Sequence, residues 1–235
     1  MAAVPKRDER QVARSVRPVS ESELQLLVEA CGAVSEAKSD YTENDFMTNV
    51  LLTVLDIRMQ SGAVDKSIHH YRDRRWKEIR TLPDLDDLLA RYPDDKEGNL
   101  RVAQYLWGNN HWVRVEWLRG FVPFLSQNNL RTQQALRNWA HRSDFKRDFE
   151  GKVKNLGIAS FKSLVMRLGV DTVKPDVHLH NFVKRAIGHG VTDEELVRVV
   201  AEAARRIGVS SRQLDASLWE YQRDRRPSMD ADDPR

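Results

Sequence analysis

Apolar residues recur at helical spacing along most of the chain, and the two-residue alternation typical of β-strands is nearly absent. Three helix starts carry a hydroxyl residue followed three positions later by Glu or Gln: Ser20 and Glu23, Thr192 and Glu195, and Ser210 and Gln213. Pro93 ends one helix, and Gly108 begins a break between two others. The pattern predicts an all-α protein of about ten helices.

Composition narrows the class of protein. The 235-residue chain is 40% hydrophobic and 31% charged, which provides enough apolar material for a folded core. Its single cysteine, Cys31, excludes a disulfide framework, a zinc site built from cysteines and a four-cysteine iron–sulfur cluster. Residues 1–14 lack a signal-peptide pattern, and no apolar run approaches the ~20 residues that span a bilayer. We therefore expect a soluble cytoplasmic monomer with no membrane partner.

Positive charge is concentrated in one part of the sequence. Between Arg131 and Arg167 there are nine Lys or Arg against three acids, although the formal charge of the whole chain is only +3. The rest of the chain is therefore net acidic. A local basic excess of this kind favours a polyanionic partner such as DNA.

The basic stretch contains a candidate hairpin, Leu156-Gly157-Ile158-Ala159-Ser160, between helical flanks. Gly157 adopts positive φ at little cost, which a tight reversal needs. The second helix would begin near Ala159 with free N–H groups that bind an anion such as a DNA phosphate. The residues predicted to grip phosphate are Gly157, Ile158, Ala159, Ser160 and Phe161, with Lys152, Lys154 and Lys162. An ordinary corner between two helices, with a solvated basic face, is the alternative.

The hairpin is followed by Lys174-Pro175-Asp176-Val177-His178, in which Asp176 lies fourteen residues after Lys162. A Leu-Gly-Ile hairpin, a second helix, a short loop and then Asp-x-His-apolar resembles the helix-hairpin-helix DNA glycosylases of the endonuclease III type. The similarity extends over about residues 40–190 and includes Val64-Asp65-Lys66 after an early apolar helix. The resemblance implies that Asp176 is the catalytic carboxylate and that His178 belongs to the DNA-binding residues.

The same resemblance implies two helical lobes flanking a positively charged DNA-binding cleft. Residues 1–43 would pack with the C-terminal lobe, and residues 44–155 would form a helical-barrel lobe. Residues 156–223 would hold the hairpin, Asp176 and the C-terminal lobe, and residues 224–235 would be a flexible tail. The expected partner is double-stranded DNA, in a nucleoid-associated location, with no cofactor and no metal.

Base removal from a duplex also requires a residue that fills the gap and a pocket for the base. In the similar enzymes the filling residue follows the early apolar helix, which indicates Arg58, Met59 or Gln60. Aromatic residues that stack on a base are candidates for the pocket, and core packing is their alternative role: Tyr105, Trp107 and Trp112.

One lysine distinguishes the bifunctional members of this family, in which it forms a Schiff base with the opened sugar, from the monofunctional members. Here Phe161 occupies that position and Lys162 follows it, rotated by about 100° on a helix. We therefore predict a monofunctional glycosylase. The alternatives are a bifunctional glycosylase/lyase, a non-catalytic DNA-binding protein, and a metal-dependent hydrolase that uses His178 and His180. Spacing in the sequence does not specify the target base.

Overall fold

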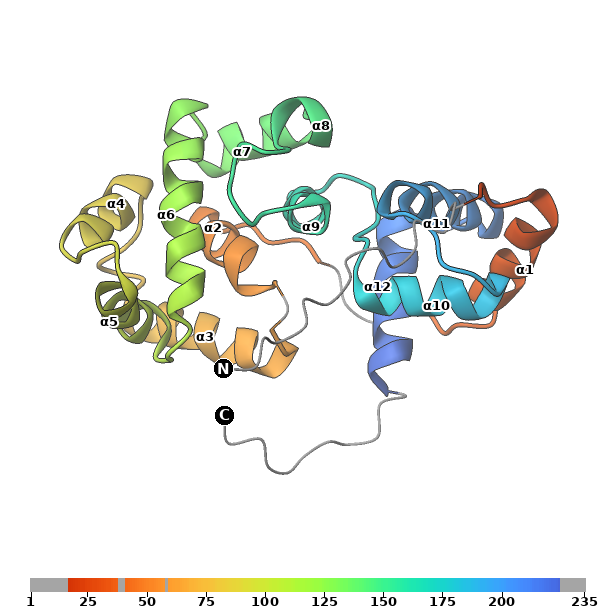
Figure 1. Ribbon diagram of the computed structural model, residues 1–235, viewed down its shortest axis with the longest axis horizontal. Coiled ribbons are helices and arrows are strands. Elements are labelled where there is room, and N and C mark those ends of the chain that lie inside the picture. The colour runs from red at the N-terminus through yellow and green to blue at the C-terminus, as the bar shows by residue number, and fades with distance from the viewer. Residues whose placement is uncertain (1–16, 38–40, 58, 225–235) are drawn as a thin grey trace, which may run out of the picture.

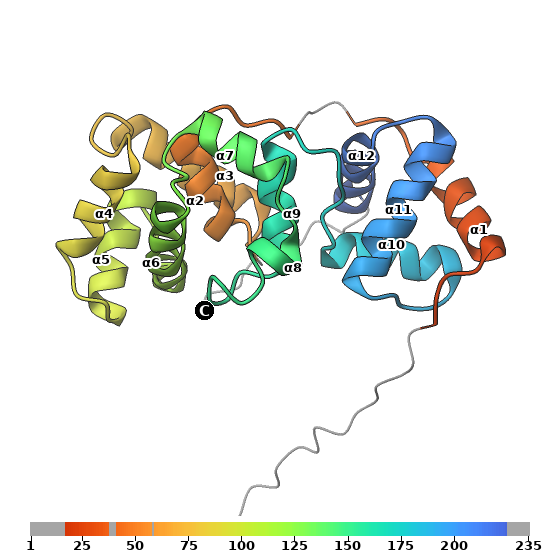
Figure 2. The ribbon, with the colours of Figure 1, turned by 90° about the horizontal axis from the view of Figure 1, so that it is seen from above.

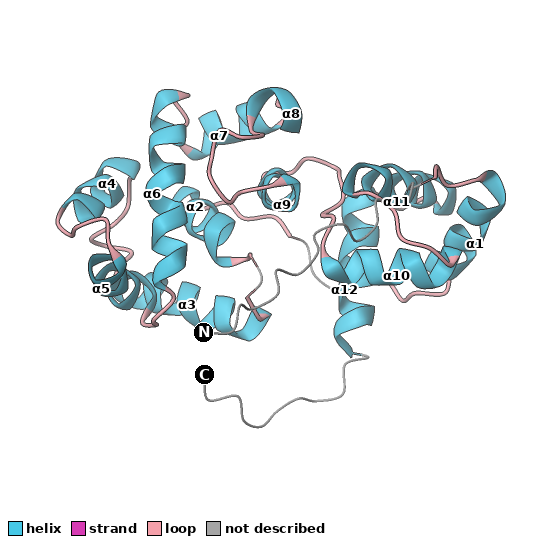
Figure 3. Cartoon of the chain, viewed as in Figure 1, coloured by secondary structure: helices cyan, strands magenta, loops and turns pink. Residues whose placement is uncertain are grey.

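The computed structural model describes residues 17–37, 41–57 and 59–224, and every regular element in these ranges is a helix (Figure 3). The expectation of an all-α protein is confirmed. The twelve described helices are α1 (Glu21–Gly32), α2 (Phe46–Leu55), α3 (Ser61–Arg74), α4 (Leu82–Ala90), α5 (Lys96–Trp107), α6 (Trp112–Gln127), α7 (Gln133–Ala140), α8 (Phe145–Asp148), α9 (Ile158–Arg167), α10 (Val177–Ile187), α11 (Asp193–Ile207) and α12 (Ser211–Asp224).

The helices form two groups, each around its own buried apolar cluster (Figures 1 and 2). The first group contains α2 to α9, with a core that runs from Phe46 to Leu168. The second combines α1 with α10, α11 and α12, so residues near both ends of the described chain share one core. The chain therefore passes from the second group to the first after α1 and returns before α10.

Helix α9 belongs to the first group. Its Phe161, Leu164 and Val165 are buried in the first core, and the Phe161 ring lies 5.5 Å from that of Phe149 and 5.8 Å from that of Trp139. After α9, the first residue that belongs to the second core is Val173. The sequence predicted a lobe boundary between residues 155 and 156, which placed α9 in the C-terminal lobe. In the structure the chain leaves the first core only after α9, because aromatic residues of the first group cover the apolar face of α9.

The predicted helix signals correspond to observed ends. Ser20 and Glu23 form a capping box at the start of α1. The expected break after α5 is confirmed at Gly108, which has φ +66°. A Cβ atom there would lie 2.5 Å from Nδ1 of His70, so the position requires glycine. Residues 225–235 of the expected tail lie outside the described residues.

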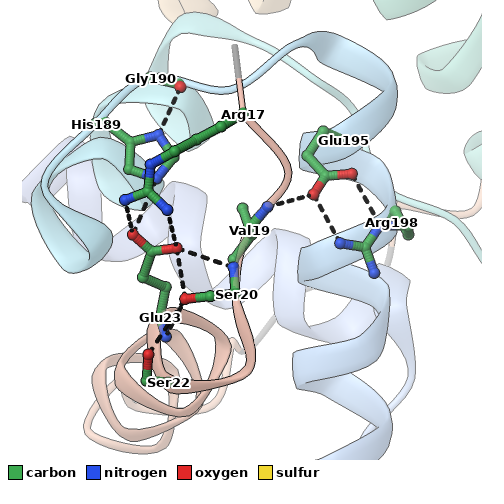
Figure 4. Close-up of polar contacts among 9 residues, drawn as sticks. All are labelled: Arg17, Val19, Ser20, Ser22, Glu23, His189, Gly190, Glu195 and Arg198. Carbon is green, nitrogen blue, oxygen red and sulfur yellow. Dashed lines mark hydrogen bonds and ion pairs between the residues drawn. The ribbon is translucent and has the colours of Figure 1, made fainter.

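Polar contacts attach the segment before α1 to the second group (Figure 4). Glu23 forms an ion pair with Arg17, and its carboxylate lies 3.2 Å from Nε2 of His189 in the turn after α10. The N–H of Val19 donates to the Glu195 carboxylate of α11, at 3.0 Å. These contacts fix the orientation of α1 against α10 and α11.

Candidate functional site

Asp176 is the N-cap of α10. Its Oδ1 accepts hydrogen bonds from the N–H groups of His178 (2.8 Å) and Leu179 (3.0 Å). The side chain is half-buried, and its Oδ2 accepts no hydrogen bond from the described residues. Two donors on one oxygen fix the orientation of the carboxylate and leave the second oxygen for other partners.

An ion pair links the segment that carries Asp176 to the first group of helices. Nζ of Lys174 donates to Oδ2 of Asp56 at 2.6 Å, and the Lys174 carbonyl accepts the N–H of Asp176 at 2.9 Å. Asp56 directly follows α2 and also accepts from the Ser163 hydroxyl of α9 at 2.8 Å. The contacts of Asp56 and Lys174 therefore join the end of α2 and helix α9 to the segment before α10. Helices α9 and α10 lie on the facing sides of the two groups (Figure 1).

A second carboxyl group lies beneath this segment. Asp215 of α12 is only 3% exposed, and its Oδ1 accepts the N–H of Lys174 at 2.8 Å. Burial, together with the negative charges of Asp176 and Asp56, raises the pKa of Asp215 to about 8. Asp215 is therefore a neutral acid at pH 7.

Arg167, the last residue of α9, is a second cation beside Asp56. It is 7% exposed and donates to the Ser163 hydroxyl at 2.8 Å and to the Thr53 hydroxyl at 2.9 Å, while its Nη1 lies 4.0 Å from Oδ2 of Asp56. Burial lowers the pKa of Arg167 to about 10. Burial opposes the charge of Asp56, but Lys174 and Arg167 outweigh this effect and lower the pKa of Asp56.

The reversal before α9 differs from the expected one. Gly157 is the N-cap of α9 and has φ −104°, so the prediction that it adopts positive φ is wrong. The left-handed residues are Gly151 (φ +70°) and Asn155 (φ +66°). The chain turns between these two positions, and by Gly157 the backbone is already extended.

The backbone at the start of α9 offers fewer donors than expected. The N–H of Phe161 donates to the carbonyl of Gly157 at 3.1 Å, and the Phe161 side chain is buried, so Phe161 does not fit the predicted phosphate grip. The N–H groups of Ile158, Ala159 and Ser160 lie in the first turn of α9, where the helix provides no carbonyl four residues earlier to accept them. Ile158 and Ala159 are half-buried and Ser160 is buried.

The three lysines near the hairpin have different surroundings. Lys152 and Lys154 are exposed; Nζ of Lys152 donates to the carbonyl of Arg147 at 2.7 Å, and Lys154 lies 3.7 Å from Glu116. Lys162 is half-buried, which lowers its pKa, and the nearby charge of Asp144 opposes this shift. Of the three lysines, only Lys152 and Lys154 are exposed.

In the segment after α2, the structure describes two of the three residues that were predicted to fill the gap left by the base. Arg58 lies outside the described residues. Met59 packs against the first core, and Gln60 is exposed at the N-cap of α3. Arg114 of α6 donates to the carbonyl of Ile57, which fixes the start of this segment against α6.

The three aromatic residues proposed for a base pocket differ in burial and in surroundings. Trp107 is 2% exposed in the first core, so its predicted role in a pocket is wrong. Tyr105 is half-buried, with its hydroxyl bonded to Glu78 and its ring beneath Arg75. Trp112 lines a hollow of about 320 Å³, whose other lining residues are Asn110, His111, Val113, Arg114 and Trp117.

The histidines after Asp176 take part in local contacts. His178 is half-buried, and its carbonyl accepts from the Gln222 side chain at 3.4 Å. Nε2 of His180 lies 2.7 Å from the Asp193 carboxylate. Within the described ranges, no group of three or more His, Cys, Asp or Glu side chains is arranged to hold a metal ion. None of the helices described is long and apolar enough to cross a membrane.

The model of a family described as "Domain of unknown function (DUF8548)" matches residues 25–223. The chain belongs to the DUF8548 family. No curated protein and no solved structure matches the chain. The matched range of the DUF8548 domain contains the whole cluster from Asp56 to Asp215.

Sequence reasoning on this DUF8548 domain missed Asp56, Lys174 and Asp215. One signal for Asp215 was present, because it follows the core residue Leu214 and precedes the core residue Leu218 on the same helix. An acid on the buried face of an amphipathic helix needs a polar partner. The partner itself, the amide of Lys174, is 41 residues away in the sequence and could not be identified from spacing.

Proposed function

We propose that this protein is a monofunctional DNA glycosylase, which hydrolyses the N-glycosidic bond of a damaged, mismatched or modified base and leaves an abasic site. The observation that carries the proposal is the setting of Asp176. Its carboxylate is oriented by two N–H groups of α10, and its neighbour Lys174 contacts Asp56, which also accepts from Ser163 of α9. The segments that the resemblance assigns to catalysis and DNA binding are therefore neighbours.

The carboxylate suits the chemistry of base release. Departure of the base develops positive charge on the deoxyribose, and a nearby carboxylate stabilises that charge electrostatically. Oδ2 of Asp176, which no described residue engages, can orient and deprotonate the attacking water. The base must first leave the stack, at a cost of a few kcal/mol.

In this proposal double-stranded DNA lies across the hairpin and the start of α10, in a cleft between the two groups of helices. The first N–H groups of α9, with Lys152 and Lys154, would bind backbone phosphates without reading sequence. Gln60, which is exposed near the end of α2, would fill the gap left by the base. Trp112 offers an indole beside a hollow on which a base can stack.

The positions of the lysines support hydrolysis rather than lyase chemistry. Lys162 has Asp144 as its charged neighbour, whereas Ser163, the next residue on α9, contacts Asp56. Consecutive residues on a helix point about 100° apart, so Lys162 is turned away from the cluster. Lys174 lies close to Asp176 but donates to Asp56.

A panel of duplex oligonucleotides tests the proposal, each carrying one uracil, mismatched thymine, alkylated purine, oxidised base or hypermodified cytosine. We expect alkali-induced strand breaks at one class of base and no adduct on treatment with borohydride, because only an amine nucleophile gives one. A trapped adduct would contradict the monofunctional assignment. Tight duplex binding without release of any base would contradict the glycosylase and favour a non-catalytic DNA-binding protein.

A further inference from the structure

The polar cluster between the two groups contains an acid that the proposed mechanism does not use. Asp56, Asp176 and Asp215 provide three carboxyl groups, and Lys174 and Arg167 provide two cations. Asp56 has two cationic neighbours, and Asp176 caps α10. Asp215 differs from Asp56 because the described donor to its carboxyl group is a backbone amide, and from Asp176 because it is only 3% exposed.

Two consecutive hydrogen bonds connect Asp215 to Asp176. Oδ1 of Asp215 accepts the N–H of Lys174 at 2.8 Å, and the Lys174 carbonyl accepts the N–H of Asp176 at 2.9 Å. Asp215 is itself fixed, because Leu214 and Leu218 anchor this turn of α12 in the second core. At 3% exposure its carboxyl group is too deeply buried to touch a substrate.

We infer that Asp215 is a positioning residue whose carboxyl oxygen accepts the N–H of Lys174. It holds the amide of Lys174 in place, and through it sets the position of the Asp176 carboxylate against the first group of helices. The positioning is a property of the fold, whereas its effect on base release rests on the proposed function. The raised pKa of Asp215 agrees with a neutral role at pH 7.

Charge balance explains why the acid must be neutral. With Asp215 protonated, the negative charges of Asp56 and Asp176 are matched by Lys174 and Arg167. Three further titratable groups of the described chain act on the cluster. Burial, with the negative charges around it, raises the pKa of Tyr41, so it is neutral as well. Glu43 acts on Arg167 but forms an ion pair with Arg72, and the charge of Glu220 acts on Tyr41. The residues of α11 buried beside α12 are apolar: Leu196, Val199, Val200 and Ala203. Ionised Asp215 would leave one negative charge unmatched, and the segment would open to admit water.

Two substitutions separate the hydrogen bond from the charge. D215N keeps an oxygen acceptor for the Lys174 amide and cannot ionise, whereas D215L has similar size and no acceptor. Hydrogen exchange of the 171–179 segment, measured by mass spectrometry, reports positioning without any substrate. At pH 7 we expect faster exchange in D215L and wild-type exchange in D215N. At pH 9 we expect the wild-type protein to exchange faster than D215N at the same pH, because only the wild-type acid ionises.

Exchange in D215L equal to that of the wild type would overturn the inference. If D215L does not fold, the comparison of wild type with D215N at pH 9 decides, and equal exchange there overturns it. Base release then tests the functional consequence: D215L is expected to lose on the order of 10²-fold in rate, as for a misplaced catalytic group, and D215N to restore it. If exchange behaves as expected but the wild type releases no base, the proposed function fails and the positioning role stands.

Discussion

At the scale of single residues, Arg167 shows how a cation is accommodated inside the first group of helices. Its guanidinium donates to Ser163 and Thr53 and to both the side chain and the carbonyl of Asn49. All three partners are buried, so they depend on Arg167 for these bonds. The residue therefore joins α9 to α2 beside Asp56.

We predict that R167M lowers the free energy of unfolding by about 3–5 kcal/mol, because it leaves buried hydrogen-bond acceptors without their donor and removes one of the two cations beside Asp56. Urea unfolding followed by circular dichroism measures this change. R206M is the matched control, because Arg206 pairs with Glu21 and Glu202 on the surface of the second group. Equal losses in the two variants would show that Arg167 has no special structural role.

Asp215 gives a prediction about the pH dependence of stability. Its folded pKa of about 8 lies above the ordinary value, so its contribution to stability is complete at low pH and is lost as the pH rises toward 8. The loss is about 1.4 kcal/mol per pH unit for one proton. Between pH 5 and pH 7, the wild type should therefore lose about 2–3 kcal/mol relative to D215N. Parallel unfolding free energies for the two proteins would contradict the raised pKa.

The sequence indicated Asp176 because the Asp lies in a recognisable local pattern with the hairpin. It did not indicate Asp56 or Lys174, although both are charged, since their partnership spans 118 residues. A charged residue carries no mark of burial in a single sequence. Trp107 failed as a pocket residue for the related reason that an aromatic side chain suits a core and a binding site equally well.

At the scale of elements, the hairpin between α8 and α9 depends on two left-handed residues rather than on Gly157. The existence of the turn was predictable from the glycine and the short helical flanks. Its geometry was not, because Asn155 adopts positive φ only as a result of how the whole turn closes. Asn tolerates this conformation better than most residues, and a β-branched residue does not.

We predict that N155V destabilises the hairpin by about 1–3 kcal/mol and weakens binding to undamaged duplex DNA, whereas N155G preserves both. Thermal unfolding and a fluorescence binding titration measure the two effects. N155G is the matched control, since it also removes the side chain but accepts positive φ. Equal weakening by both variants would mean that the amide side chain matters rather than the backbone.

The exposed lysines of the hairpin allow a separate test of phosphate binding. K152E and K154E should each weaken duplex binding irrespective of sequence and lower the slope of log K against log salt concentration by about 1. R101E, at an exposed position of α5 in the first group, changes the charge by the same amount outside the hairpin. A reduction of the slope by R101E equal to that of the hairpin variants would argue against phosphate contact at the hairpin.

At the scale of the whole molecule, the helices form two groups (Figure 2), each with its own apolar core. The ion pair between Lys174 and Asp56 joins the two groups. Periodicity was sufficient to predict the all-α class and most helices, because each helix buries one apolar stripe. It was insufficient to divide the helices between the cores, since an apolar stripe does not specify which partner covers it. The pairing of α1 with α10 and α11 and the placement of α9 both depend on tertiary contacts.

The most direct test of the catalytic role of Asp176 compares two capping aspartates. D176N and D95N both keep a side chain that caps a helix, since Asp95 caps α5 as Asp176 caps α10. In single-turnover base release on the lesion panel, we predict that D176N loses release while it still binds the duplex, and that D95N matches the wild type. Base release by D176N at the wild-type rate would contradict the account.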